Sequence, residues 1–530
     1  MIGCTPTHAM IRSAFGVLLG VALLAVTGCA TLPREYPRPS SEAWGHPEQT
    51  AIGRAFAGEL AAHPELSAFH LLPGNVDAFA ARVALAEAAQ RTLDLQYYTV
   101  ANDDATNTLL SRVAAAAERG VRVRLLVDDF YVVGRDVDVA AFAAHPNIEV
   151  RVFNPFLRRG PLGVSRFFEL IGDTARLNHR MHNKLFVADN AAAVIGGRNL
   201  GNEYFGAESE AGFVDLDVLV LGPVVRQAST SFDEYWRSEW AIPIEAFVSV
   251  PPPREDVARV IEGLHNVEQR TRTSEFGRRV QAAELVEKIT TGRVQFTWAR
   301  AQAVADPPGK GKPHADDLRD THIRPQLRSL LGGVRSEIVL VSPYFVPGAP
   351  GLAQLTQLRE RGVAVRVLTN SLAGTDMPVV YAGYSRYHVA LLQAGVELYE
   401  LRPSGGSRDD QERLVRALGS ERATLHAKTF VVDRRYVFVG SMNLDPRSDA
   451  INTEFGMLID SPELSGQLLA LLGPLTAPQR SYRLVLSGGH VEWVTEVDGQ
   501  PVRTTSPPDA GTGRRINAAI LSVLAPEELL

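Results

Sequence analysis

The feature that most constrains the fold of this chain is an internal repeat. A strand-like run at 93–98 is followed by a helical pattern, and Gly120 then opens an apolar strand. The same order returns at 338–344, where Gly362 precedes the second strand. A glycine that follows a helix and opens a buried strand is typical of a βαβ unit. Two such copies predict two α/β halves, each with helices covering its sheet through right-handed crossovers.

The repeat also sets the domain boundaries that we expect. Prolines and polar, helix-favouring residues separate the two copies, and a turn-rich loop ends this separating segment. The expected order is a lipoprotein signal peptide at 1–28, a tether and N-terminal segment at 29–75, a first half at 76–245, a helical linker and loop at 246–318, a second half at 319–480 and a C-terminal extension at 481–530.

Composition narrows the functions that are open to the chain. A net charge of −6 argues against a surface that binds nucleic acid, because such a surface usually needs a strongly basic face. The only cysteines are Cys4 and Cys29, so the rest of the chain has no disulfide and no cysteine metal site. If the protein is exported, its core must therefore be stable without cross-links.

The N-terminal residues predict an exported lipoprotein. Arg12 precedes an apolar run at 14–26, which is shorter than the roughly 20 residues that span a bilayer. Small residues then lead to Cys29, and this pattern resembles a bacterial lipobox, in which the cysteine is acylated. The alternatives are a simple signal peptide cut near Ala30, or an uncleaved anchor. Because Ala30 is not an aspartate, the sorting pattern favours the outer membrane over the inner membrane, with the protein facing the periplasm.

The strongest functional signal is a constellation that occurs once in each half. Both copies read H-x-K-x4-D-x6-G-[GS]-x-N. Residues two apart in a strand point to the same face, so we expect the histidine and the lysine of each copy to lie side by side in an apolar strand. An ammonium and an amide donor beside an imidazole suit the charged oxygens of a phosphodiester. The residues are His182, Lys184, Asp189 and Asn199 in the first half, and His426, Lys428, Asp433 and Asn443 in the second.

This double motif resembles the paired HKD motifs of the phospholipase D superfamily. The resemblance implies two α-β-α sandwich halves related by a pseudo-twofold axis, with one active site between them. It also implies that one histidine attacks phosphorus and forms a phosphohistidine. The other histidine would protonate the leaving alkoxide and then deprotonate the incoming alcohol or water. The lysines and asparagines would stabilise the equatorial oxygens, and neither a metal nor a cofactor is implied.

The sequence does not decide which histidine attacks. In the superfamily the N-terminal motif usually supplies the nucleophile, so the resemblance favours His182, with His426 as acid and base. An imidazole nucleophile needs an acceptor at its other nitrogen, and Asp215 and Glu454 stand at similar places after the two asparagines. We expect these carboxylates to orient the histidines. The two motif aspartates lie near strand ends, which favours structural hydrogen bonds over contact with substrate.

Longer stretches resemble the bacterial cardiolipin synthase C group. Members of that group join two phospholipids and expel a small alcohol. The resemblance implies phosphatidylglycerol as acceptor and phosphatidylethanolamine as a candidate donor, with the lipid anchor holding the site at a membrane surface. Gly197 departs from the serine that many superfamily members have at this position. The stretches are 178–184, 196–205, 216–220, 342–348, 381–384, 391–396 and 526–530.

Other functions stay open at this point. A hydrolytic phospholipase D would use the same residues with water as acceptor, and the sequence does not show how water is excluded. An exported phosphodiesterase or nuclease also fits the motif, although the acidic balance and the anchor count against it. An inactive lipid-binding protein is disfavoured because both motifs are intact.

Weaker patterns have a structural interpretation beside a functional one. The acidic pairs at 103–104 and 128–129 are either metal ligands or capping carboxylates, and capping is favoured. The apolar stretch at 377–387 either admits acyl chains or packs in the core, which is the commoner role. Four aromatic residues either line the cleft or belong to the core: Tyr97, Tyr98, Tyr344 and Phe345.

Overall fold

The structure of the protein is a computed structural model. It describes residues 36–131, 135–157, 169, 172–207, 212–248, 250–310, 322–403 and 423–527. The predicted signal peptide and the predicted lipidation site at Cys29 therefore lie outside the described residues. Within the described ranges, every helix is too short or too polar to span a bilayer.

The first half is built on a mixed sheet. Its central strands β2, β3 and β4 are parallel, and β5, β6, β8 and β1 continue the sheet in antiparallel pairs. In spatial order the strands are β9 (Ala241–Pro243), β4 (Ile148–Phe153), β3 (Arg122–Asp128), β2 (Thr92–Tyr97), β5 (Leu185–Ala188), β6 (Ala192–Gly196), β8 (Asp217–Leu221) and β1 (Ser67–Leu72).

The second half repeats this order and extends it. Strands β11, β12 and β13 are parallel and correspond to β2, β3 and β4, while β15, β16, β17 and β10 take the places of β5, β6, β8 and β1. The strands are β10 (Thr297–Ala305), β17 (Phe455–Asp460), β16 (Tyr436–Gly440), β15 (Thr429–Val432), β11 (Glu337–Val341), β12 (Ala364–Asn370), β13 (Glu397–Leu401), β18 (Ser481–Ser487), β19 (His490–Val497) and β20 (Gln500–Thr504).

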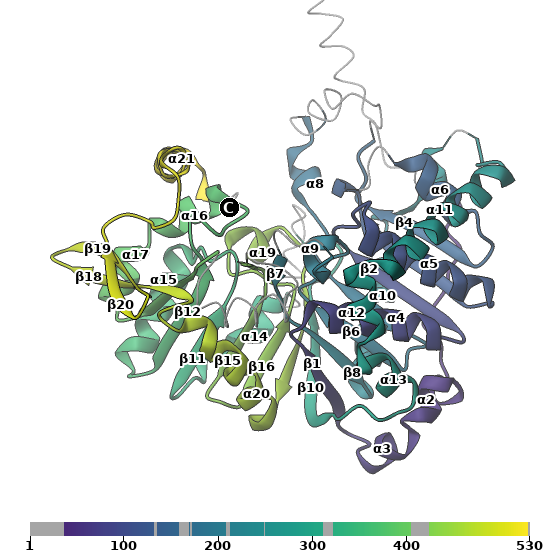
Figure 1. Ribbon diagram of the computed structural model, residues 1–530, viewed down its shortest axis with the longest axis horizontal. Coiled ribbons are helices and arrows are strands. Elements are labelled where there is room, and N and C mark those ends of the chain that lie inside the picture. The colour runs from purple at the N-terminus through teal and green to yellow at the C-terminus, as the bar shows by residue number, and fades with distance from the viewer. Residues whose placement is uncertain are drawn as a thin grey trace, which may run out of the picture.

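The two halves meet where β1 pairs with β10, so that one sheet runs through both (Figure 1). Ala68 of β1 lies opposite Trp298 of β10 in an antiparallel pair. An antiparallel pair has local twofold symmetry, which fits a pseudo-twofold axis between the halves. The predicted duplicated α/β fold is thus confirmed. Strand β10 lies within the range 246–318 that was predicted as helical linker and loop, and it pairs with β17 of the second half.

Glycines end the first crossover helix of each half, as the repeat predicted. Asp103 caps the start of α5 (Asp104–Glu118), because its carboxylate accepts a hydrogen bond from the Thr106 amide at 3.0 Å. Gly120 then adopts φ +93°, and Gly362 adopts φ +82° after α15 (Gly348–Glu360). This left-handed conformation suits glycine and turns the chain from the helix into the next strand.

Helices cover both faces of each half-sheet. In the first half α4 (Asn75–Ala88) and α5 cover one face, and α10 (Pro223–Arg237) covers the other. In the second half α14 (Ile323–Gly332) and α15 take the places of α4 and α5, and α20 (Pro462–Leu472) covers the opposite face. The inner core includes apolar residues from α10, α20 and both half-sheets, so the two halves share it.

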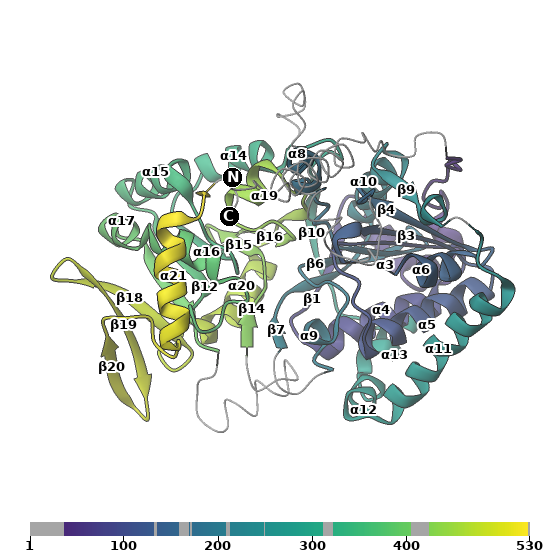
Figure 2. The same ribbon diagram turned by 90° about the horizontal axis from the view of Figure 1, so that it is seen from above.

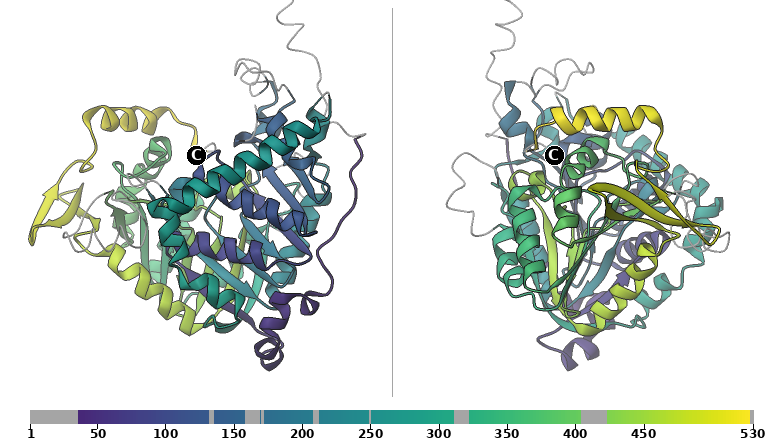
Figure 3. Two further views of the ribbon diagram at one scale, coloured as in Figure 1. Left: turned by 45° about the vertical axis from the view of Figure 1, so that its right-hand side comes forward. Right: turned by 90° about the vertical axis from the view of Figure 1, so that its left-hand side faces the viewer.

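The additions to the repeat are different in the two halves. The linker helices α11 (Arg254–Thr273), α12 (Glu275–Gln281) and α13 (Glu284–Thr290) pack over α4 and α5 on the outer side of the first half (Figures 2 and 3). The second half instead gains β18–β20 and α21 (Thr512–Leu524), which packs on α16 (Pro378–Ser385). Tyr381 and Tyr384 of α16 are buried, so the apolar stretch at 377–387 contributes to the core.

Candidate active site

The histidine segment of each half leaves its own sheet and pairs with the opposite half. We predicted the histidines and lysines inside apolar strands, but β5 and β15 begin only after the lysines. The His182 amide donates to the Thr453 carbonyl at 2.9 Å, and the His426 amide donates to the Val214 carbonyl at 2.8 Å. The second contact continues a short parallel pairing between β7 (Gly212–Val214) and β14 (Ala423–Leu425). The prediction was wrong because these backbone groups find their partners across the interface.

Each histidine also receives its carboxylate from the opposite half. Glu454 follows Thr453, and its two carboxylate oxygens lie 3.0 and 2.9 Å from His182 Nδ1. Asp215 follows Val214, and its Oδ2 lies 2.6 Å from His426 Nδ1. A carboxylate at Nδ1 favours the tautomer in which this nitrogen carries the proton. In both histidines Nε2 then keeps its lone pair, which is the form needed for attack on phosphorus or for accepting a proton.

Burial controls the charge of these groups. Burial lowers the pKa of His182 to about 4, which outweighs the raising effect of Glu454, and burial also lowers the pKa of His426. Burial alone would raise the pKa of Asp215, but His426 and Lys428 hold it at about 2. The site therefore presents neutral imidazoles beside ionised carboxylates at neutral pH. A bound phosphodiester anion would favour protonation of the histidines and lysines, because opposite charges stabilise each other.

The two lysines lie beside their histidines, as the motif spacing predicted. Lys184 Nζ donates to the His182 carbonyl at 2.6 Å, and Lys428 Nζ donates to the His426 carbonyl at 2.5 Å. Lys428 Nζ also lies 3.0 Å from His426 Nδ1, but that nitrogen directs its proton to Asp215, so the approach is electrostatic. Burial lowers the pKa of Lys428 to about 8 and that of Lys184 well below its usual value. Both ammonium groups can be stabilised by an anion in the site.

The two asparagines have different surroundings. Asn199 accepts a hydrogen bond from the Thr99 amide at 3.2 Å and donates to the Tyr204 hydroxyl at 3.0 Å. The ring of Tyr204 lies 5.2 Å from that of His426, so this tyrosine links the first half to the histidine of the second. Asn443 is 4% exposed, and its Oδ1 has no hydrogen-bond partner among the described residues. This oxygen is therefore open to a hydrogen-bond donor of a ligand.

The motif aspartates lie at the far ends of β5 and β15, away from the histidines. Asp189 has φ +57° and Asp433 has φ +51°, in the tight turns that join each strand to the next. Their carboxylates accept hydrogen bonds from consecutive backbone amides at the entry to β2 and β11. These bonds hold the hairpin that carries each motif. The donors are Gln90, Arg91 and Thr92 for the first aspartate, and Arg335, Ser336 and Glu337 for the second.

The departure at Gly197 has a steric reason. In the second half, the Ser441 hydroxyl donates to the Glu454 carboxylate. In the first half, a Cβ on Gly197 would lie only 2.1 Å from Oδ1 of Asp215. Aspartate is one methylene shorter than glutamate, so its carboxylate stays closer to the backbone. The halves therefore use two matched combinations, glycine with aspartate and serine with glutamate.

Comparison with known proteins agrees with this geometry. Residues 83–236 and 327–473, which contain both motifs, match the family described as "Cardiolipin synthase, PLD-like domain". Cardiolipin synthase C of Escherichia coli (strain K12) is 38% identical over 473 residues, which cover 88% of this chain and 97% of that protein. The chain belongs to this family.

Two further similarities are weaker. Cardiolipin synthase B of Escherichia coli (strain K12) is 24% identical over 380 residues, covering 71% of this chain and 72% of that protein. The solved structure of phosphatidylserine synthase from Haemophilus influenzae Rd KW20 matches with a TM-score of 0.53 at 13% identity, covering 82% of this chain and 92% of that one. The similarity to the phosphatidylserine synthase structure is a similarity of fold.

Buried polar residues around the motifs support the site, and none of them was predicted from the sequence to have this role. Arg198 is buried and donates to the Asp215 carbonyl at 2.9 Å, which fixes the backbone of the orienting carboxylate. Ser448 donates to Glu454 at 2.7 Å. Asp128 pairs with Arg180 at 3.0 Å and accepts from the Met181 amide, so this acidic residue holds the histidine segment.

The four aromatic residues that could line the cleft or belong to the core differ in their positions. Tyr97 is fully buried in the core, whereas the ring of Tyr98 lies 5.2 Å from that of His182. The Tyr344 hydroxyl donates to Asp376 at 2.7 Å, and Phe345 lines a cavity in the second half. Tyr204 has a clear place beside His426 that we did not predict, although it lies in the 196–205 stretch that carries the family resemblance.

Proposed function

We propose that the protein transfers a phosphatidyl group from one phospholipid to the hydroxyl of another, as a cardiolipin synthase, through a covalent phosphohistidine. The observation that carries the proposal is the crossed pair of histidine–carboxylate contacts. It gives a single site two imidazoles of the same tautomer, one available as nucleophile and the other as acid and base. The similarity to cardiolipin synthase C over nearly the whole of that protein supports phospholipids as substrates.

The first step is attack on the phosphorus of the donor lipid. With the phosphodiester anion bound, His426 carries a proton on Nε2 as well as on Nδ1. His182 Nε2 forms a bond to phosphorus while the bond to the leaving alkoxide breaks, and His426 gives that alkoxide its Nε2 proton. Lys184, Lys428 and the two motif asparagines stabilise the charge on the equatorial oxygens. Glu454 stabilises the positive charge that develops on the attacking ring. The assignment of His182 as nucleophile follows the usual order in the phospholipase D superfamily.

The second step reverses these roles. His426, which is now neutral, removes the proton from the hydroxyl of the acceptor lipid. The acceptor oxygen bonds to phosphorus, the phosphorus–nitrogen bond breaks, and His182 returns to its starting form. With phosphatidylglycerol as acceptor the product is cardiolipin. With water as acceptor the same steps would release phosphatidic acid.

Lipid analysis in cells tests this function. The wild-type chain and His182→Ala are expressed in a strain that lacks cardiolipin synthases, and extracted lipids are measured by mass spectrometry. We expect cardiolipin with the wild type alone, at equal levels of exported protein. A rise in phosphatidic acid without cardiolipin would show a hydrolase, and unchanged lipids would refute phosphatidyl transfer.

We also propose that acylation of Cys29 holds the enzyme at a periplasm-facing membrane surface. The apolar run at 14–26 and the small residues before Cys29 support this. Two or more acyl chains anchor a protein stably, whereas one chain binds only marginally. Mass spectrometry of the mature N-terminal peptide should find a diacylated or triacylated cysteine, and Cys29→Ser should leave the peptide without lipid. Membrane fractionation of the wild type then separates the outer from the inner membrane.

A further inference from the structure

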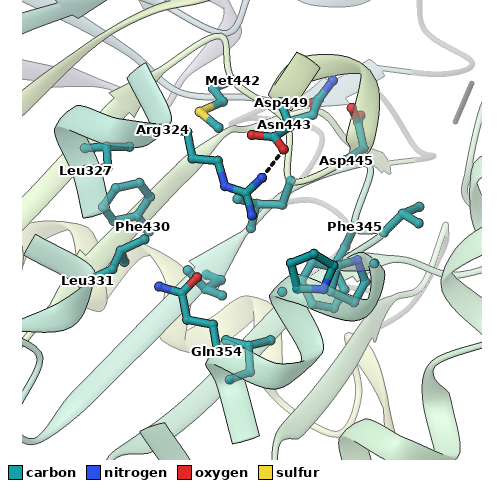
Figure 4. A pocket seen from close by; sticks show the side chains of 18 of the residues that line it. Arg324, Leu327, Leu331, Phe345, Gln354, Phe430, Met442, Asn443, Asp445 and Asp449 are labelled. Atoms are coloured by element: carbon teal, nitrogen blue, oxygen red, sulfur yellow. Dashed lines mark hydrogen bonds and ion pairs between the residues drawn. The ribbon is translucent and has the colours of Figure 1, made fainter. Parts of the chain in front are cut away.

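A cavity of about 330 Å³ lies inside the second half, between the sheet and the helices α14 and α15 (Figure 4). Its wall is mostly apolar, although Gln354, Glu527 and the polar residues near Asn443 also line it. Aliphatic side chains project from both helices, and two stacked phenylalanines, with ring centroids 4.8 Å apart, come from β15 and β16. The principal wall residues are Leu327, Leu331, Leu355, Leu358, Phe430 and Phe438.

One side of the cavity is formed by a segment that carries the second motif. Met442 and Asn443 line the cavity, and Asn443 is also the motif asparagine that our mechanism places against phosphate. Arg324 and Asp449 form an ion pair across the same side, next to Asn443 and Asp445 (Figure 4). Asn443 therefore belongs both to the second motif and to the wall of this cavity.

The corresponding space in the first half is filled by side chains. Arg82 extends between α4 and the sheet, where it lies 2.9 Å from Asp217 and donates to the Tyr97 hydroxyl at 3.0 Å. Phe79 packs edge-on against Phe205, at 5.1 Å between centroids. The repeat therefore does not require a hollow at this place, and the cavity is a property of the second half.

We propose that this cavity binds one acyl chain of the phospholipid whose phosphate lies between His182 and His426. The inference rests on the proposed function and adds to it a binding site for the lipid chain. The part of the wall formed by the leucines and phenylalanines suits an acyl chain better than a polar headgroup, because a polar group buried there would lose its hydrogen bonds. If a methylene takes about the 30 Å³ of a water molecule, the space holds roughly ten carbons of a chain.

The chain length of the substrate should therefore affect the rate. Each methylene moved from water into an apolar site can raise affinity by about fourfold, so filling the cavity offers a large gain over a short chain. We compare kcat/KM for dihexanoyl and dioleoyl phosphatidylglycerol in mixed micelles. Leu331→Trp narrows the cavity from the partly buried face of α14, and Ser329→Trp places the same ring on the exposed face as a control.

We expect Leu331→Trp to lose about tenfold in kcat/KM with the dioleoyl lipid while staying within about twofold of wild type with the dihexanoyl lipid. Ser329→Trp should match the wild type with both lipids, and all three proteins should melt at similar temperatures. An unchanged chain-length preference in folded Leu331→Trp would overturn the inference.

Photo-crosslinking separates this inference from the proposed function. A phosphatidylglycerol with a diazirine in one acyl chain is irradiated with the unmodified chain, and labelled peptides are mapped. Labels on α14, α15 or β15 support the acyl site, whether or not the wild type transfers a phosphatidyl group. If it transfers none, only the proposed transfer function is refuted. Turnover with labels only outside the cavity overturns the acyl site and leaves the proposed function standing.

Discussion

Helix α4 of the first half and helix α14 of the second occupy equivalent places but are packed differently. α4 is buried on nearly every side, because α12 and α13 cover its outer surface. α14 buries only Ile323 and Leu327 among its described side chains and borders a cavity. Around the reacting groups, by contrast, the backbone bonds His182–Thr453 and His426–Val214 repeat almost unchanged. The duplication has thus preserved the geometry of the reaction and diverged where the halves meet different surroundings.

The sharpest way to break the equivalence of the two histidines is to remove each in turn. His182→Ala and His426→Ala should each lower transfer between natural lipids by on the order of 10⁴, because one step loses its nucleophile or its proton donor. With a p-nitrophenyl phosphodiester the leaving group needs no proton. His426→Ala should then still accumulate a phosphoenzyme, which His182→Ala cannot form, as measured by rapid quench with labelled phosphorus. The opposite pattern would assign attack to His426.

Removing the charge of each orienting carboxylate tests whether the two histidine–carboxylate pairs contribute equally to catalysis. Glu454→Gln and Asp215→Asn should each lower kcat by on the order of 10³, because the amide no longer stabilises the charged ring. In the wild type, phosphoenzyme formation should fall as pH drops through about 4, where His182 becomes protonated, rather than through 6.5. Glu454 raises this pKa, so Glu454→Gln should move the acid limb to still lower pH. A limb that stays in place would contradict the assigned contact.

Core truncations should expose the difference in packing between the halves. Phe276 of α12 packs against Phe79 at 5.0 Å in the closed first half, so Phe276→Ala should lower the free energy of unfolding by about 3 kcal/mol. Leu331 already borders empty space, so Leu331→Ala should cost about 1 kcal/mol. Urea unfolding measures both changes. Equal losses would show that the second half is packed as tightly as the first.

The glycine–aspartate and serine–glutamate combinations can be exchanged. Gly197→Ser should lower activity about tenfold, because the new side chain collides with Asp215 and displaces it from His426. Adding Asp215→Glu should recover part of this loss, since the first half then resembles the second. Steady-state kinetics of the single and double variants measure the recovery. If the fractional activity of the double variant equals the product of those of the two single variants, the combinations are not matched.

The features that could be predicted from the sequence are those that depend on short stretches of the chain. Gly120 and Gly362 marked the helix ends because their conformation is a local requirement. The motif spacing placed His182 beside Lys184 and His426 beside Lys428, and its interpretation put Asp189 and Asp433 in structural bonds, a role that the hydrogen bonds at the two turns support. Each of these relations involves residues that are neighbours in the chain or in one hairpin.

What the sequence left open depends on contacts between the halves. Asp215 and Glu454 were selected as orienting carboxylates, but their exchange between histidines joins residues as far as 272 positions apart. The strand prediction for His182 failed for the same reason, since its amide partner lies in the other half. The sequence also contained no sign of the cavity. Leu327 and Phe430 follow the pattern of ordinary core residues, and the cavity exists because no other side chains fill the space beside them.

Because the crossed carboxylates come from two halves of one chain, formation of the site is independent of protein concentration. If the halves were separate chains, His182 would contact Glu454 only after the chains associate, and dilution would separate them again. A covalent connection holds two partners at an effective concentration on the order of millimolar, provided the linker spans them. Here β1 and β10 continue one sheet across the junction, which fixes the partners still more closely. An enzyme spread thinly over a membrane would thus keep every site assembled.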